Sequence, residues 1–430
     1  MLDTTLIDTQ KLSRFQLATI LICVLMNMMD GIDVMVISYT APAIAKEWSV
    51  SAQSLGNVLS AGLVGMMLGA LFLAPRADVI GRRKVIIISG LLMGVSVFCT
   101  SFAPSVDVLL FLRVLSGIGI GSMIASVGTL VSEYAPQKTK AFWVSFIMSG
   151  YPIGATLSGF VAANIIPVHG WRFMFQMAGI ATLLPIPIIF IYLAESISFL
   201  LKAQPVNALS KINTVLERMN APQLSALPAP SFSDTDKKKV PISALFSEKY
   251  KKATIFLWLA LFLAFGTMYF LTTWIPKLAT NAGLSMSLAI YAGTVFNMGA
   301  FFGIITQGYL SNTFGLRRTV FGILVLTALL MVVFGFFKGS AWVLVLFGLI
   351  GFGIQGGYVG IYTMAATLYR TEIRSTGVGW ATGMGRIGSI VGPILGGFLI
   401  SVGLTMSSNF IVFAIPTIIA GVVVLLIKNT

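Results

Sequence analysis

Charged residues are scarce in this sequence, and so are cysteine and histidine. Only 10% of the 430 residues are charged, against about 25% in an ordinary soluble domain, whereas 57% are hydrophobic. The mean hydropathy is +0.94, and a soluble globule cannot bury so much apolar surface. A soluble enzyme and a disordered chain are therefore excluded. Two cysteines and one histidine provide no disulfide framework, metal-ligand spacing or catalytic triad.

The hydrophobic residues gather in runs of about 20, which is the length of a membrane-spanning helix. These runs do not alternate polar and apolar residues, so they favour helices over the strands of a membrane barrel. We therefore predict an all-α membrane protein with twelve transmembrane helices. The predicted spans are residues 15–42, 52–74, 83–103, 106–132, 141–166, 172–194, 252–275, 286–311, 318–338, 341–368, 374–401 and 406–427.

The basic residues are distributed unevenly over this topology. The chain has 28 Lys and Arg and 14 Asp and Glu, for a net charge of +14. Of the 28 basic residues, 22 fall in the two tails, the even-numbered loops and the span ends beside them, and four fall in the odd-numbered loops and the span ends beside them. The positive-inside rule then places both termini in the cytoplasm. Topology thus explains the basic excess, and we expect no nucleic-acid partner.

One long polar stretch divides the predicted spans into two groups of six. It covers residues 202–251 and contains five prolines and a run of three lysines. An amphipathic segment near residues 206–219 is suited to a membrane surface. We expect a first six-helix bundle in residues 1–201, a cytoplasmic linker in residues 202–251 and a second six-helix bundle in residues 252–430.

The two groups of spans share an internal repeat. A spacing of 234 residues separates Pro42 from Pro276, Gly81 from Gly315 and Gly117 from Gly351. A spacing of 238 residues separates the glycine series 150, 154, 159 from the series 388, 392, 397. Such repeats are typical of secondary transporters, whose site lies near the membrane midplane between two halves. One chain supplies both halves, so we expect a monomer.

Four charged side chains lie well inside the predicted spans: Asp30, Asp33, Arg113 and Arg386. Each costs about 2.5–3.5 kcal/mol at the centre of a membrane helix, so it must be paired, hydrated or functional. Asp33 and Arg113 each lie about seven residues from the outer end of their spans, and therefore at similar depth. Asp30 and Asp33 are three residues apart, so both project from one side of the helix.

The turn after the second span resembles the loop signature of the major facilitator superfamily. It reads A-P-R-A-D-V-I-G-R-R over residues 74–83, with Ala74 and Arg76 where glycine and leucine are usual. A second copy over residues 308–318 has Asn312 in place of the acid. The resemblance covers essentially the whole chain and implies a transporter of two pseudo-symmetric six-helix bundles.

A narrower resemblance is to the aromatic acid:proton symporter branch of that superfamily. The first span contains D-G-I-D at residues 30–33, and the eleventh contains G-R-I-G at residues 385–388. The sequence L-R-V-L-S-G-I-G around Arg113 resembles the arginine motif of the superfamily's fourth span. The branch imports benzoate-like, hydroxybenzoate-like and related diene acids such as muconate with protons.

The resemblance implies a multi-pass protein of a bacterial inner membrane that works by alternating access. Its partners would be membrane lipid, a small organic anion and a proton. It implies no enzymatic activity, and the sequence contains no nucleotide or metal motif, so we expect no cofactor. The alternative is a proton-coupled drug efflux antiporter. The arginines inside the spans favour anions, because a cationic drug would favour uncompensated acids.

Asp30 and Asp33 are the candidates for proton coupling. A neighbouring acid and a low dielectric favour the protonated form of a carboxyl group, whereas a nearby arginine favours the charged form. An acid poised between these effects can bind and release protons. The superfamily fold packs spans one and four in the same half, so the depth match with Arg113 makes Asp33 the better candidate.

Arg386 and Arg113 are the candidates for binding the substrate carboxylate, because arginine presents a planar fork that fits it. An aromatic acid also needs flat walls. We select Tyr358 and Tyr362, which are four residues apart on one face of the tenth span. The wider set of aromatic candidates is Tyr39, Tyr151, Tyr269, Trp274 and Trp380. Trp274 is near a predicted span end, where it would anchor the chain at the membrane interface.

The turn between the second and third spans is the candidate gate. By resemblance, Asp78, Gly81, Arg82 and Arg83 form a cytoplasmic gate that holds the halves together when the inner side is closed. Glu133, at the inner end of the fourth span, is the expected partner of Arg82 or Arg83.

Overall fold

The computed structural model describes residues 12–136, 139–227, 242–334 and 342–427. All elements of these residues are helical. In the first part of the chain they are α2 (Arg14–Glu47), α3 (Ala52–Leu68), η1 (Gly69–Leu73), η2 (Ala74–Arg76), α4 (Ala77–Ile80), α5 (Arg82–Thr100), α6 (Val106–Tyr134), α7 (Lys140–Met148), α8 (Gly150–Leu183) and α9 (Pro185–Tyr192). Then follow α10 (Ile197–Ala203), α11 (Ala208–Arg218), η5 (Ile242–Phe246), α12 (Lys251–Asn281), α13 (Met286–Phe314), α14 (Leu316–Val333), α15 (Trp342–Leu368), α16 (Thr371–Ser401) and α17 (Met406–Leu426).

Hydroxyl side chains start several of the long helices. A serine or threonine at the N-cap accepts a hydrogen bond from a backbone N–H of the first turn, which would otherwise have no partner. The Ser13 cap of α2 is reciprocated by Gln16, whose side chain accepts from the Ser13 backbone, and the two form a capping box. Single hydroxyl caps at other helix starts are Ser51, Ser105, Ser285 and Thr405.

Eleven helical segments of the described residues are long and apolar enough to cross a membrane. One of them, Phe146–Tyr192, has 47 residues, which is about 70 Å of helix and more than twice the hydrocarbon thickness. The backbone breaks within it at Gly170, where φ is 78° and ψ is 174°. The break separates the predicted spans 141–166 and 172–194, so the twelve-span prediction accounts for this segment as two crossings.

Side chains brace the break at Gly170 from the end of α2. Trp171 donates a hydrogen bond of 2.6 Å from Nε1 to Oε2 of Glu47. Arg172 forms an ion pair with the same carboxylate and covers the Trp171 ring at 4.3 Å. A left-handed glycine followed by this cluster turns the chain back into the membrane.

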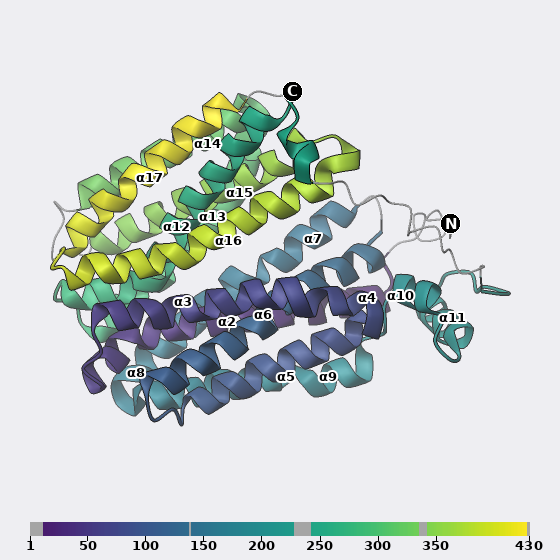
Figure 1. Ribbon diagram of the computed structural model, residues 1–430. Coiled ribbons are helices and arrows are strands. Elements are labelled where there is room, and N and C mark those ends of the chain that lie inside the picture. The colour runs from purple at the N-terminus through teal and green to yellow at the C-terminus, as the bar shows by residue number, and fades with distance from the viewer. Residues whose placement is uncertain (1–11, 137–138, 228–241, 335–341, 428–430) are drawn as a thin grey trace.

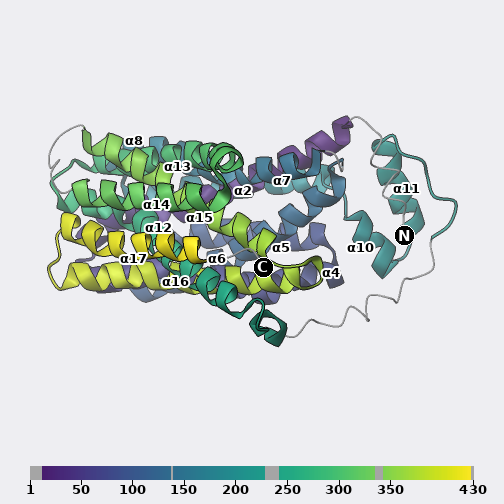
Figure 2. The ribbon, with the colours of Figure 1, turned by 90° about the horizontal axis from the view of Figure 1, so that it is seen from above.

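The helices form two groups with the same internal pairing. In the first group α2 packs against α8, and α6 packs against both α3 and α5; in the second α12 packs against α16, and α15 packs against both α13 and α14. The groups meet where α2 contacts α12, α3 contacts α16 and α8 contacts α13 (Figures 1 and 2). We call the described part of residues 12–201 the first half and that of residues 252–427 the second half.

The linker helices α10 and α11 lie together at one end of the bundles, beside α4 (Figure 1). We call the opposite end, where α2 and α12 end and α3 and α13 begin, the far end. The amphipathic segment predicted near residues 206–219 is helical as α11, but its membrane-surface placement is wrong. Ile212 and Leu216 on its apolar face are at most 1% exposed, because this face packs against protein.

Candidate functional site

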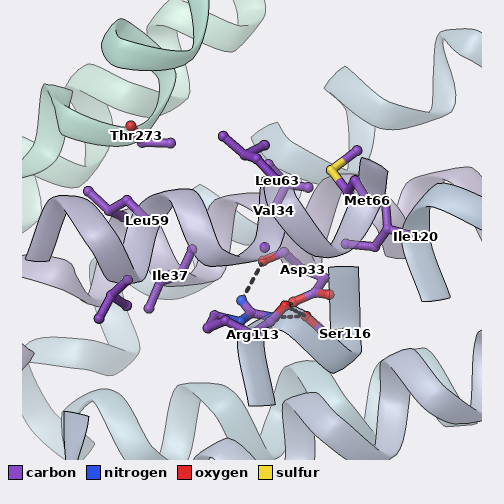
Figure 3. Close-up of a pocket in the computed structure, with 12 residues that line it drawn as sticks. Asp33, Val34, Ile37, Leu59, Leu63, Met66, Arg113, Ser116, Ile120 and Thr273 are labelled. Atoms are coloured by element: carbon purple, nitrogen blue, oxygen red, sulfur yellow. Dashed lines mark hydrogen bonds and ion pairs between the residues drawn. The ribbon is translucent and has the colours of Figure 1, made fainter. Parts of the chain in front are cut away.

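The four charges inside the membrane fall into two sets. Asp33 on α2 and Arg113 on α6 form an ion pair within the first half (Figure 3). Arg113 also donates from Nη1 to the backbone oxygen of Asp33 at 3.3 Å, and from Nη2 to the hydroxyl of Ser116. Both charged side chains are almost completely buried, at 0% and 2% exposure. Arg113 is thus occupied by its own half of the protein.

This pair borders a small, partly open cavity (Figure 3). The other walls are mainly apolar side chains of α2, α3 and α6, together with Thr273 from α12 of the second half. One carboxylate oxygen of the pair, Asp33 Oδ2, has no hydrogen-bond partner among the described residues. One oxygen of the pair therefore lacks a hydrogen bond, and the cavity beside the pair reaches the boundary between the halves.

The second set of charges, Asp30 and Arg386, lies across that boundary. Asp30 on α2 is 1% exposed and lies within electrostatic reach of Arg386 on α16 and of Tyr151 on α8. Arg386 donates from Nη1 to the hydroxyl oxygen of Tyr269 at 3.4 Å and is also within reach of Tyr358. One acid and one arginine thus share a shell of tyrosines contributed by both halves. We call these five residues the central cluster.

Glycines next to the two charges bring their helices close to the neighbouring ones. A Cβ on Gly31, beside Asp30, would lie 2.1 Å from the backbone oxygen of Tyr151. A Cβ on Gly388, two residues after Arg386, would lie 2.1 Å from the backbone oxygen of Phe262 on α12. Only glycine permits such backbone approaches. The D-G-I-D sequence therefore brings the helix of Asp30 close to α8, and the G-R-I-G sequence brings the helix of Arg386 close to α12.

The selected aromatic residues lie in different surroundings. Tyr358 is part of the central cluster and meets the Phe265 ring edge-on, with 4.6 Å between the ring centres. Tyr362 is 40% exposed and one helical turn further along α15. Sequence reasoning named Tyr151 and Tyr269 only within a wider set. The signal that distinguishes them is their proximity to Asp30 and Arg386 across the boundary, which a linear pattern does not contain.

The expectation that Trp274 anchors the chain at the membrane interface is wrong. Its side chain is 0% exposed and donates from Nε1 to the backbone oxygen of Pro393 at 3.0 Å. The helix α12 continues to Asn281, beyond the predicted span end at residue 275. Trp274 therefore lies about two turns inside the helix.

The candidate gate residues are held within the first half. Arg82 forms an ion pair with Glu133, the partner expected from the sequence, and a second at 3.5 Å with Asp78. Arg83 donates from its side chain to the backbone oxygen of Phe190 at the end of α9. Asp78 is the exposed member, with 65% of its side chain accessible.

Glu195 and Ser196 also contact the candidate gate residues, although we did not predict these contacts from the sequence. Glu195 accepts hydrogen bonds from the backbone N–H groups of Arg83 at 3.0 Å and Ser196 at 2.9 Å. Gly81 has φ of 102°, and a Cβ there would lie 2.3 Å from Oε2 of Glu195. The glycine thus lets a carboxylate cap the start of α5, where the helix dipole favours negative charge. The signal was the A-E-S sequence at the end of the sixth predicted span.

The fold and this arrangement of charges are those of a membrane transporter with two halves. The family model for the Major Facilitator Superfamily matches residues 23–307 and 257–430. The chain belongs to this superfamily. It is therefore an integral, multi-pass membrane protein and a transporter, not an enzyme.

Curated relatives cover nearly the whole chain. A benzoate transport protein of Acinetobacter baylyi is 32% identical over 99% of this chain and 92% of its own length. A 4-hydroxybenzoate transporter, PcaK, of Pseudomonas putida is 33% identical over 97% of this chain and 93% of its own length. A gallate transporter of Pseudomonas putida is 31% identical, with the same two coverages.

Solved structures agree on the fold. The inward-open xylose transporter XylE from E. coli superposes with a TM-score of 0.72 at 15% identity, and covers 96% of this chain and 97% of its own. A bacterial homologue of the human lysosomal transporter Spinster, inward-facing and occupied, gives a TM-score of 0.73 at 17% identity, with 97% of each chain covered.

Proposed function

We propose that this protein imports a small aromatic carboxylate together with a proton across the bacterial inner membrane by alternating access. The observation that carries the proposal is the central cluster, in which Arg386 and a buried Asp30 lie within electrostatic reach of one another across the two halves. The relatives support the substrate class. Benzoate, 4-hydroxybenzoate and gallate share a carboxylate on an aromatic ring and differ in its hydroxyl groups.

Arg386 is the proposed carboxylate ligand. Its guanidinium is always charged and presents donors in a planar fork that matches a carboxylate. The hydrogen bond from Arg386 to the Tyr269 hydroxyl is long, at 3.4 Å, so a substrate carboxylate can take over these donors at little cost. The rings of Phe265, Tyr269 and Tyr358 are flat walls beside this cation and suit an aromatic ring.

Arg113 is a weaker candidate for the same role. Its charge is already compensated by Asp33, and both side chains are buried. A carboxylate substrate would have to displace that ion pair inside a region of low dielectric, where breaking a pair is costly. We propose that Arg113 acts on the substrate through the position of α2, and that Arg386 binds it directly.

The proton coupling follows from charge balance in the central cluster. Asp30 and Arg386 together carry no net charge when both are ionised. Binding of a carboxylate to Arg386 would add a negative charge beside buried Asp30, which favours protonation of Asp30. We therefore propose Asp30 as the acid that takes up the proton with the substrate. Asp33, which sequence reasoning preferred, remains a second proton site through its unpartnered Oδ2.

The orientation is part of the proposal. The positive-inside bias places the termini, the linker helices and the gate around Arg82 in the cytoplasm. The hydrogen bonds between the halves from Ser38, Ser60 and Ser287 lie toward the far end, which we assign to the outside. The gate around Arg82 would then hold the halves together in the opposite state, in which the far end is open and the cytoplasmic end is closed. We propose that one chain works alone, without a partner subunit.

Uptake into proteoliposomes with an imposed pH gradient tests this function. The substrates to compare are benzoate, 4-hydroxybenzoate, gallate, muconate, nicotinate and a cationic dye. We expect accumulation of a benzoate-like acid, abolished by a protonophore. Accumulation of muconate in preference to every ring acid would contradict the aromatic substrate class, and dye transport against the proton gradient would show the efflux antiporter instead.

A further inference from the structure

Two prolines inside membrane helices leave backbone carbonyls without their usual donor. Proline has no N–H, so the carbonyl four residues before it loses its hydrogen bond within the helix. Pro276 in α12 removes the donor for the carbonyl of Thr272. Pro167 in α8 removes the donor for the carbonyl of Ala163. In a membrane protein such carbonyls must find other partners, because lipid supplies none.

Serines of the opposite half supply both missing donors. Ser38 on α2 donates to the carbonyl of Thr272 at 3.0 Å and also to that of Thr273 at 2.9 Å. Ser287 on α13 donates to the carbonyl of Ala163 at 2.8 Å. The arrangement is reciprocal, because the first half gives the hydroxyl at one contact and the freed carbonyl at the other.

A third contact between the halves follows a similar pattern. Ser60 on α3 donates to the carbonyl of Ile390 on α16 at 2.9 Å. The neighbouring carbonyl, that of Ser389, is the one that Pro393 leaves without a donor. The three main helix pairs through which the halves meet are α2 with α12, α3 with α16 and α8 with α13. Each therefore has a serine hydroxyl on a carbonyl at, or one residue from, a position freed by proline.

Because they are buried, these hydrogen bonds contribute more to the stability of the contact than a hydroxyl hydrogen bond at a surface would. Ser38 is 0% exposed and Thr272 is 3% exposed. A buried carbonyl that loses its only partner retains the full cost of desolvation, whereas a carbonyl already bonded in its helix does not. By contrast, the hydroxyl of Ser158 donates to Ala155 in its own helix at 3.0 Å, so separation of the halves would not break that bond.

We propose that Ser38 with the Thr272 carbonyl, and Ser287 with the Ala163 carbonyl, form a latch that holds the far end closed. The latch separates when the far end opens during transport, and the prolines set its strength by leaving the two acceptors unpaired in the open state. This inference rests on the alternating access of the proposed function, and it does not depend on which acid is carried.

Distance measurements between spin labels at the far end test the latch. Exposed Lys46 at the end of α2 and exposed Asn281 at the end of α12 are replaced by labelled cysteines, with Cys23 and Cys99 changed to alanine. The protein is in lipid nanodiscs without substrate or pH gradient. We expect Ser38→Ala to raise the ratio of long to short distances about tenfold, the effect of one buried unpaired carbonyl. The control Ser158→Ala should leave it unchanged.

The role of proline is tested by repeating the change in a Pro276→Ala background. Alanine restores the N–H that bonds the Thr272 carbonyl within α12, so Ser38→Ala should now change the ratio by less than about threefold. The second contact repeats the test: Ser287→Ala should raise the ratio of long to short distances, and a Pro167→Ala background should reduce this effect. The second pair of variants keeps the test informative if Pro276→Ala fails to fold. The latch would be overturned if a serine variant shifted the distance ratio equally in both backgrounds, or if neither serine variant shifted it. An error in the proposed substrate would appear only in the uptake assay.

Discussion

At the residue scale, the guanidinium of Arg386 has two functions in this account: it binds the substrate carboxylate and stabilises Asp30. We expect Arg386→Lys to raise the KM for a benzoate-like acid about tenfold to a hundredfold, because a point charge replaces a planar fork and charged hydrogen bonds are worth about 1.5–3 kcal/mol. The measurement is concentration-dependent uptake. The control Arg76→Lys changes an exposed arginine and should leave the KM unaltered; equal KM values for both variants would remove the assignment.

The hydroxyl of Tyr269 positions Arg386, and its ring is a proposed wall of the site. Tyr269→Phe keeps the ring and removes the oxygen that accepts from Nη1 of Arg386 at 3.4 Å. We expect a modest rise in KM of about twofold to tenfold, in keeping with one weak hydrogen bond. Tyr269→Ala also removes the ring and should have a clearly larger effect. Two variants with the same KM would show that the ring does not contact the substrate.

The buried pair of Asp33 and Arg113 makes a different prediction, on stability. Asp33→Asn leaves a buried guanidinium without its counter-charge and should destabilise the fold by about 3–5 kcal/mol. The double variant Asp33→Asn with Arg113→Gln removes both charges and should recover much of this loss. Thermal unfolding in detergent measures both, with exposed Asp107→Asn on α6 as the control. If Asp33→Asn were as stable as the unchanged protein, the carboxylate would not be a required counter-ion.

The sequence contained enough to predict one of the two charge sets. Asp33 and Arg113 lie at matching depths in spans of the same half, so their contact follows from span positions and the fold. Asp30 and Arg386 meet across the two halves, and their proximity depends on helix rotation and on the close approaches at Gly31 and Gly388. Neither can be read from hydropathy, which fixes depth only to about one helical turn.

At the element scale, the helices were predicted better than their ends. α2 continues past Pro42 to Glu47, and α12 past Pro276 to Asn281, whereas the predicted spans end at residues 42 and 275. Proline near a helix end usually marks a boundary. At Pro276 the freed carbonyl instead finds a serine from the other half, so the helix continues. Contacts between elements distant in the sequence therefore determine where this helix ends, and the local sequence does not show them.

The proposed gate around Arg82 joins α4, α5 and α6 to the segment that follows α9. Glu133→Gln removes the partner of Arg82, and because both side chains are partly buried we expect a shift in state populations that slows uptake several-fold without unfolding. Initial uptake rates and thermal unfolding together measure this. The control Glu248→Gln changes an exposed acid. Unfolding at a much lower temperature with Glu133→Gln would show a structural role in place of a gating one.

At the scale of the whole molecule, composition and the glycine and proline repeats were sufficient to predict an all-helical transporter of two similar halves. They could not show that the second half brings Arg386 to Asp30, whereas the first half holds a neutralised pair of its own. In the proposed mechanism, this asymmetry permits a carboxylate and a proton to bind together near the boundary. The two halves share a fold, and their charges differ.

The most direct test of this coupling compares two assays on Asp30→Asn in proteoliposomes. Counterflow exchanges labelled benzoate-like acid across the membrane without net proton movement, whereas accumulation under a pH gradient requires it. We predict that Asp30→Asn retains counterflow and loses accumulation, because asparagine mimics the protonated acid. Accumulation at the normal level by Asp30→Asn would contradict the proposal that Asp30 carries the coupled proton.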